Sequence, residues 1–144
     1  MFREVFMSEE NKRLMHRWFD EVWTKGSSAA ISEMITDDLV VHGLTDPGGA
    51  PVTSADAFRE FHKTFRGAFP NIVVEVEDCI AEGDKVVARC AVRGKHTGDS
   101  LGVSATNADV DFTGIAICRI RDGRIAEAWN NFDFMRLNRQ LGVL

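Results

Sequence analysis

The spacing of apolar residues changes once along this chain, and the change occurs at Asn71. Before it, apolar side chains recur every three to four residues, which is the period of an amphipathic helix. After it, apolar and polar side chains alternate, which is the period of a half-buried strand. The chain is therefore predicted to form helices first and an antiparallel sheet afterwards, an α+β fold. The strands are expected at residues 38–42, 72–80, 86–96, 110–120 and 125–132.

Two helices are expected before the first strand. The longer one covers residues 9–25, with Ser8 as its N-cap and Gly26 at its end. One apolar stripe runs along it and consists of Leu14, Met15, Trp18, Phe19, Val22 and Trp23. A shorter one follows, capped by Ser27 or Ser28. Two histidines on helices, His16 and His62, have polar neighbours and are expected at the surface.

A third helix is predicted to begin at Thr53, because Asp56 three residues later completes a capping-box pattern. It carries four phenylalanines on one side, which are expected to pack against the sheet. Gly and Pro residues between 43 and 52 predict an irregular loop before it. A terminal helix is expected after Asp133, which is interpreted as its N-cap.

Length and charge narrow the class of protein. With 144 residues, the chain is expected to hold an N-terminal extension at 1–8 and one domain at 9–144. Its net charge of −5 and its lack of a basic stripe argue against a nucleic-acid partner. No apolar run approaches the ~20 residues of a membrane span, and no signal peptide is seen, so a cytoplasmic protein is expected.

Chemistry-bearing motifs are scarce. The three cysteines are odd in number and lack CxxC spacing, so neither a disulfide framework nor a zinc site is expected. No two histidines stand at ligand spacing, and no GxSxG or glycine-rich nucleotide loop is present. The chain also contains no tyrosine, which excludes any mechanism that uses a phenol. No metal and no cofactor are therefore predicted.

Strand alternation predicts which side chains face the helices. In the strand at 72–80 it places Ile80 on the same face as Ile72, Val74 and Val76. The inward positions of the last three strands are mostly Ala, Cys or Gly, too short to fill the space under a helix layer. This leaves two possibilities: a small-molecule cavity, or a space closed by the aromatic rings of the helices. If there is a cavity, its polar members are predicted to be His42, His96 and Asn130. Its lining is expected to include Trp18, Phe61, Phe112, Ala116 and Phe132.

The outward face of the same strands is apolar too. Ile115, Ile117, Ile125 and Trp129 all fall on the outward side of the alternation. A patch of this kind is seldom left in water. A homodimer through the outer sheet face is therefore expected.

Four stretches together resemble the SnoaL-like polyketide cyclases, also called ester cyclases, of the cone-shaped nuclear-transport-factor-2-like (NTF2-like) superfamily. They span most of residues 9–142, and the GKHTG element, the RIRDGRI turn and the terminal QLG are the more specific parts. The stretches are ENKRLMHRWFDEVW, FPNIVVEVEDCIAEGDKVVARCAVRGKHTG, FTGIAICRIRDGRIAEAW and NRQLG. The resemblance implies helices packed on a strongly curved sheet around a pocket, a homodimer, and ring closure by aldol condensation without cofactor.

The resemblance also implies an acid/base aspartate directly after the tryptophan of the last strand, where this chain has Asn130. A carboxamide cannot act as a general base. A histidine or aspartate that the family often has at the position of Ala116 is missing as well. If the chain is a cyclase or isomerase acting on a small apolar carbonyl compound, His96 or His42 is the expected base, with Asn130 as an oxyanion donor. The alternative is a non-catalytic protein that binds such a ligand.

Overall fold

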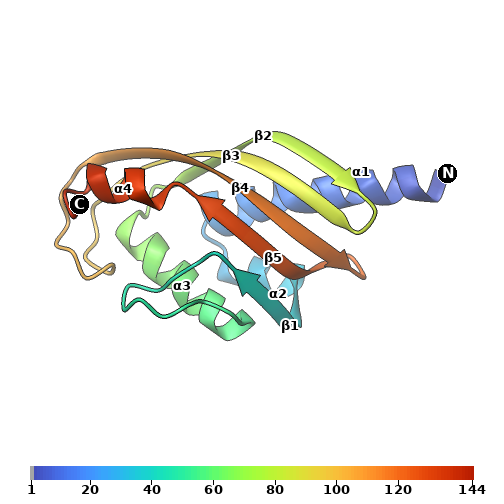
Figure 1. The fold of residues 1–144 in the computed structure, drawn as a ribbon, viewed down its shortest axis with the longest axis horizontal. Coiled ribbons are helices and arrows are strands. Elements are labelled where there is room, and N and C mark those ends of the chain that lie inside the picture. The colour runs from blue at the N-terminus through green and yellow to red at the C-terminus, as the bar shows by residue number, and fades with distance from the viewer. Residues whose placement is uncertain (1) are drawn as a thin grey trace.

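The computed structural model describes residues 2–144, which form four α-helices, one π-helix and five strands (Figure 1). The elements are, in chain order, α1 (Phe2–Arg17), η1 (Trp18–Thr24), α2 (Ser28–Met34), β1 (Ile35–His42), α3 (Ala55–Ala68), β2 (Val73–Glu82), β3 (Lys85–Lys95), β4 (Asp109–Arg121), β5 (Arg124–Phe132) and α4 (Phe134–Gln140). The α+β class is confirmed.

The five strands form one sheet in the order β1-β5-β4-β3-β2. Strands β2 to β5 pair antiparallel, but β1 runs parallel to β5. The prediction of an antiparallel sheet is therefore wrong for β1. The physical reason is the long crossover between the two strands, since α3 and the other three strands lie between them in the chain.

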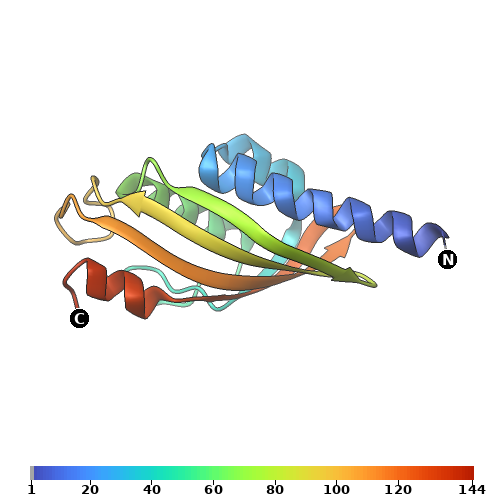
Figure 2. The same cartoon turned by 90° about the horizontal axis from the view of Figure 1, so that it is seen from above.

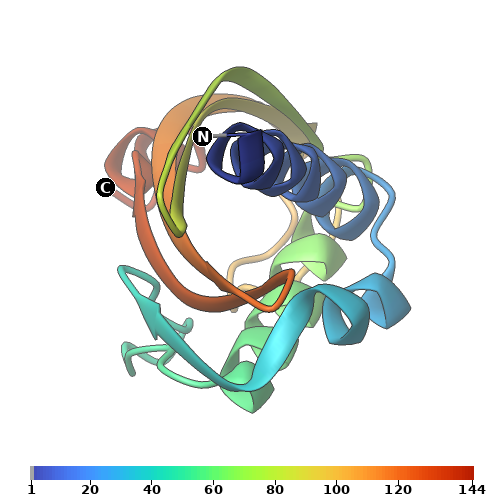
Figure 3. The same ribbon diagram turned by 90° about the vertical axis from the view of Figure 1, so that its right-hand side faces the viewer.

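The sheet is strongly curved, and the helices close its open side. Seen end-on, the strands curl around the interior, with α1 and α3 opposite them (Figure 3). Helix α1 and η1 pack on β2, and α3 packs on β1. Helix α1 runs along the sheet, and its first turns project past the β2–β3 turn (Figure 2). None of the helices in residues 2–144 is long and apolar enough to span a membrane.

The start of the chain differs from the prediction. Helix α1 begins at Phe2, so Ser8 lies inside the helix and does not cap it. Of the expected extension at 1–8, residues 2–8 form the first turns of α1, and Met1 lies outside the described residues. The helix expected to reach residue 25 changes to a π-helix at Trp18.

The caps of α2, α3 and α4 follow the expected residue types with one shift. The Ser27 hydroxyl accepts from the backbone N–H of Ala30 at 3.1 Å, and the Asp133 carboxylate accepts from Arg136 N–H at 3.0 Å. The cap of α3 is Ser54, one residue after the predicted Thr53. Ser54 takes this role because its backbone is extended and its hydroxyl reaches Ala57 N–H at 3.2 Å.

Irregular pairing in β2 and in β5 reverses the expected facing of side chains. In β2 the register shifts between Val76 and Asp78, so Ile80 points outward and is 66% exposed. In β5 the shift next to Ile120 turns Ile125 into the core, where the outer face was predicted. A bulge adds one residue to one strand, and every side chain beyond it changes face.

Candidate functional site

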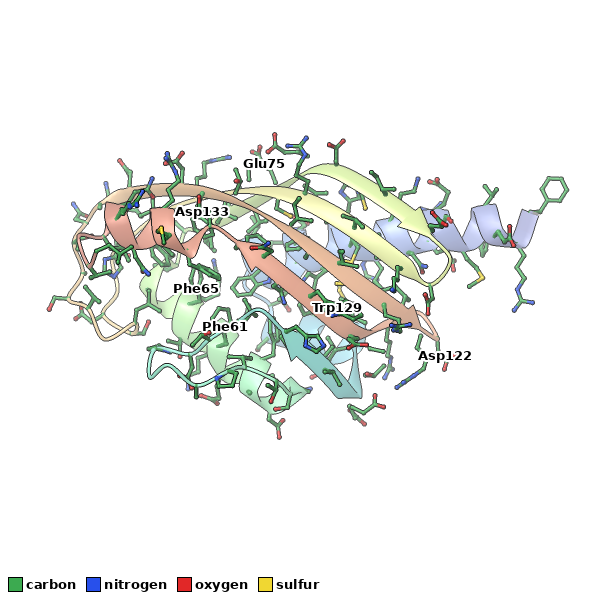
Figure 4. All side chains as sticks on the ribbon, in the orientation of Figure 1. Phe61, Phe65, Glu75, Asp122, Trp129 and Asp133 are labelled. Carbon is green, nitrogen blue, oxygen red and sulfur yellow. The ribbon has the colours of Figure 1, made fainter. Side chains whose placement is uncertain are left out.

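A cavity of about 70 Å³ lies between the concave face of the sheet and the helices. All five strands contribute side chains to the lining on the sheet side, and η1 and α3 contribute most of those on the helix side. Figure 4 places Phe61 and Phe65 on α3 below the sheet. The lining consists of Trp18, Phe19, Trp23, Ile35, Leu39, Val41, Leu44, Phe58, Phe61, Phe65, Ile72, Val74, Val92, Phe112, Ala116, Cys118, Ile125, Ala128, Asn130, Phe132 and Phe134.

Short side chains on β4 and β5 leave the space. Ala116 pairs with Asn130 and Cys118 pairs with Ala128, so small inward positions are adjacent on both strands. Gly114 pairs with Phe132, and a Cβ at this glycine would overlap the Phe132 ring. The missing side chain therefore lets that ring lie across β4 beside the cavity.

Aromatic rings fill most of the same space from the helix side. Trp23 stands edge-on to Phe61 and Phe65 at 6.2 and 5.9 Å between ring centroids, and Trp18 lies 5.4 Å from Phe58. An apolar cavity of about 150 Å³ is known to hold benzene, so 70 Å³ admits only part of a ring unless side chains move. Both of the alternatives drawn from the sequence are thus partly realised.

All five residues expected in the lining are found there: Trp18, Phe61, Phe112, Ala116 and Phe132. Among the lining residues that were not named from the sequence are Phe19, Trp23 and Val41. The two aromatic residues lie in the stripe of the first predicted helix, which was the signal for them. Val41 lies next to His42 on β1, and the alternation that placed His42 inward gave no reason to include Val41.

Asn130 is the one carboxamide in the lining. Its Nδ2 donates to the carbonyl of His42 at 3.0 Å. A carboxamide has a second N–H and a carbonyl oxygen, and neither makes a hydrogen bond within the described chain. Asn130 can therefore donate one hydrogen bond and accept others at the cavity wall.

The prediction that His42 faces the cavity is wrong. Its ring is stacked on Trp129 on the outer face, with centroids 5.4 Å apart, and its Nε2 lies 2.8 Å from Glu127 Oε2. Trp129 is labelled on β5 in Figure 4. The parallel register of β1 with β5 shifts between Ile35 and Val40, which turns His42 outward. The hydrogen bond from His42 also lowers the pKa of the Glu127 carboxyl.

His96 is fully buried, as the alternation predicts, but it does not line the cavity. Its ring packs on Phe69 at 5.4 Å, and Phe69 in turn packs on Phe65 in the cavity wall. The Nδ1 atom accepts from the Thr106 backbone N–H at 3.1 Å. The proton of the neutral ring must then be on Nε2, which has no partner among residues 2–144. In this arrangement Nε2 is a donor and not a base.

The lining contains no carboxylate, imidazole or amine. Its one titratable side chain is Cys118, and burial raises the pKa of that thiol to about 12. The thiol therefore stays protonated at neutral pH. No group of three His, Cys, Asp or Glu side chains within residues 2–144 could hold a metal ion. The cavity as built is suited to binding, with Asn130 as its polar contact.

A buried histidine next to the cavity was missed. His62 on α3 is 4% exposed, although polar neighbours in sequence predicted the surface. Its Nε2 donates to the carbonyl of Val22 at 2.7 Å, and its ring stands 4.9 Å from the indole of Trp23. The sequence did contain a signal for this burial. The spacing of apolar residues along α3 places position 62 on the buried side of the helix, next to Phe58 and Phe61.

Comparison with protein families gives a match over most of the chain. The family described as SnoaL-like polyketide cyclase matches residues 13–141. No functionally curated protein matches the chain.

Solved structures share the fold over almost the whole chain. AclR from Streptomyces galilaeus, provisionally described as a hydroxylase, is 27% identical with a TM-score of 0.82, covering 95% of this chain and 83% of that one. A provisionally assigned polyketide cyclase from Bacillus cereus is 30% identical with a TM-score of 0.77, covering 94% and 82%. A SnoaL-like protein from Jannaschia, at 23% identity and a TM-score of 0.80, covers 95% and 94% and supports the fold.

Proposed function

This chain belongs to the SnoaL-like polyketide cyclase family, and on that premise we propose that it binds a small, mostly apolar carbonyl compound in the cavity between sheet and helices. The observation that carries the proposal is the composition of the lining: apolar and aromatic side chains surround the single carboxamide of Asn130. Pockets for small molecules are commonly built in this way, with a few polar groups that fix orientation.

Asn130 is the proposed contact for the carbonyl group. Its Nδ2 already donates one hydrogen bond to the His42 carbonyl, which holds the side chain in place on β5. The second N–H is available for a ligand oxygen. Ala116 on β4 pairs with Asn130 and adds little bulk beside the amide, and a ring-sized ligand enters when the aromatic side chains of the lining move aside.

Binding without general-base catalysis is the function that this geometry supports best. Removing a proton next to a carbonyl needs a base within hydrogen-bond reach of the carbon atom. His42 faces outward, His96 lies behind Phe69, and the Cys118 thiol remains protonated. Asn130 cannot take the proton, because a carboxamide is not basic.

Cyclase-type acid/base chemistry is the second candidate, and the family match favours it. It would convert a small apolar carbonyl compound by intramolecular aldol condensation or isomerisation, without a cofactor. Asn130 would stabilise the enolate oxygen as a hydrogen-bond donor. The base would have to be His96 after a rearrangement of Phe69 and of the Thr106 hydrogen bond.

Proton exchange of a simple ketone separates the two candidates. Cyclohexanone is titrated into the protein and binding is followed by NMR from pH 5 to 9, while deuterium uptake at its α-carbon is measured in D2O. We expect saturable binding that is flat over this range, with no acceleration of exchange. Exchange that is accelerated at neutral pH and abolished by His96→Gln would establish the second candidate. The absence of saturable binding would refute the proposal.

The proposal includes a homodimer formed through the outer face of the sheet. Ile115 and Ile117 on β4 are 45% and 37% exposed there. Next to them, Trp129 carries the His42 ring on one side, and the Lys85 and Arg119 side chains lie 5.6 and 5.7 Å from its ring centroid. A second copy would cover this surface and remove the isoleucines from water.

A further inference from the structure

The helix that carries both tryptophans of the cavity lining is not an α-helix throughout. Residues Trp18–Thr24 form a π-helix that continues directly from α1, without a capping side chain. π-Helical turns are rare, and they occur mostly as single turns at functional sites. Trp18, Phe19 and Trp23 of this segment all line the cavity.

The π-helical register is what brings both indoles to the cavity. At 3.6 residues per turn, side chains five residues apart point about 140° away from each other. In a π-helix the backbone hydrogen bonds join residues i and i+5, so Trp18 and Trp23 lie one turn apart on the same side of the helix. If the segment returned to α-helical register, one indole would leave the cavity wall.

The wide turn leaves a carbonyl for a side chain. The backbone N–H of Lys25 donates to the backbone carbonyl of Asp20 at 2.8 Å, and the backbone N–H of Ser27 donates to the backbone carbonyl of Glu21 at 2.9 Å. The next carbonyl, that of Val22, accepts from His62 Nε2 at 2.7 Å. An α-helix would use this carbonyl for the backbone N–H of residue 26.

His62 is held firmly in this position. The side chain is buried, and its ring packs between Phe58 at 6.4 Å and Trp23 at 4.9 Å. Burial lowers the pKa of His62, so the ring is neutral at pH 7 and its one proton lies on Nε2, toward the carbonyl. The ring therefore fixes both the backbone of the π-helix and the indole of Trp23.

We propose that His62 is a positioning residue: its hydrogen bond to the Val22 carbonyl maintains the π-helical turn, holds Trp18 and Trp23 in the cavity wall, and so determines which ligands fit. The part that concerns ligands rests on the proposed binding function. The part that concerns the turn does not, because it is a property of the ligand-free protein.

A pair of substitutions tests the hydrogen bond. Gln at position 62 can place an amide N–H near the position of Nε2, whereas Asn is one methylene shorter and cannot reach the carbonyl. In His62→Asn we expect amide exchange of Lys25 and Ser27 to become at least tenfold faster. The indole resonances of Trp18 and Trp23 should shift, while that of Trp129 on the outer face stays in place. In His62→Gln the two amide exchange rates should remain within threefold of the wild-type rates. The indole resonances should not shift.

Ligand selection is measured in the same proteins. The ratio of the dissociation constants for 2-tetralone and cyclohexanone should change at least tenfold in His62→Asn and less than threefold in His62→Gln. His16→Asn, on the exposed side of α1, is the matched control and should change nothing. Equal behaviour of the Gln and Asn variants would overturn the proposal. If the wild type binds neither ketone, the proposed function fails, and exchange and indole shifts still decide the role of His62.

A measurement on the wild type is independent of any folding defect in the variants. The nitrogen chemical shifts of the His62 ring report which nitrogen carries the proton. The proposal requires the proton on Nε2. A proton on Nδ1 would overturn it.

Discussion

Single hydrogen bonds decide what the polar side chains around the cavity can do. Thr106 occupies Nδ1 of His96 and leaves Nε2 as a buried donor without a partner. The His42 carbonyl occupies one N–H of Asn130 and leaves the other available. The residue types alone, two histidines and one asparagine, suggest two bases and a donor. Their partners leave one usable group, the Asn130 amide.

Replacing Asn130 tests that group directly. In Asn130→Ala we expect the affinity for cyclohexanone to fall about two- to tenfold, because one hydrogen bond contributes about 0.5–1.5 kcal/mol. Asn131→Ala, at the next and exposed position, is the control and should bind as the wild type does. NMR titration gives both constants. Equal affinities of the two variants would show that Asn130 does not contact the ligand.

His62 gives a second prediction, for stability against pH. Its pKa is lowered mainly by burial and further by the Arg66 guanidinium, while the hydrogen bond to Val22 opposes the shift. The folded state therefore binds a proton less readily than the unfolded state, whose histidine titrates near pH 6.5. The stabilisation is complete above about pH 6.5 and is lost as the pH falls below it, by at most about 1.4 kcal/mol per pH unit.

Urea unfolding at pH 7.5 and 5.0 checks this prediction. The loss of unfolding free energy between the two pH values should be smaller in His62→Gln than in the wild type. His16→Gln should lose as much as the wild type. Carboxylates such as Asp38 and Asp111, whose pKa values are also lowered, contribute equally to all three proteins and cancel in the comparison. Identical losses in all three would contradict the prediction.

At the scale of elements, the pairing of β4 with β5 shapes the cavity. Gly114 faces Phe132, and the ring occupies the space where a Cβ would stand. In Gly114→Ala we expect a loss of about 1–3 kcal/mol in unfolding free energy, typical of overpacking in a core. Cyclohexanone binding should weaken as well, because the displaced Phe132 ring lies in the lining.

Thr113→Ala is the control for this change, because position 113 is the exposed neighbour on the same strand. Urea unfolding and NMR titration of both variants give the comparison. If Gly114→Ala is as stable as Thr113→Ala, the close contact between β4 and the Phe132 ring is not required for the fold.

At the scale of the whole molecule, the curved sheet has an inner and an outer apolar surface. Its concave side holds the cavity and its outer side carries the isoleucines and Trp129. Ile117→Lys should convert the proposed homodimer into a monomer, because a charge would be buried without a partner. Met135→Lys, on the exposed side of α4, should not change the mass. Light scattering measures the mass of each protein in solution. A monomeric wild type would contradict the proposed homodimer.

Much of the fold and part of the site followed from local patterns. Alternation along β4 and the second half of β5 correctly assigned Ala116, Asn130 and Phe132 to the inner face, because a strand without a bulge keeps its parity. The aromatic stripes of the first and third helices identified Trp18 and Phe61 for the same reason, since helical spacing alone decides which residues share a face.

What only the tertiary structure decided depends on contacts between distant segments. The facing of His42, Ile80 and Ile125 depends on where a neighbouring strand accepts an extra residue, and that choice is made by hydrogen bonds across the sheet. The parallel pairing of β1 with β5 joins residues 87 to 90 positions apart, and the bond from His62 to Val22 joins residues 40 positions apart. Period and capping residues act within one element, so the sequence by itself determined most of the elements and the apolar faces of those without a bulge. Registers between elements are set by packing, which is why the base expected at the cavity is absent from its lining.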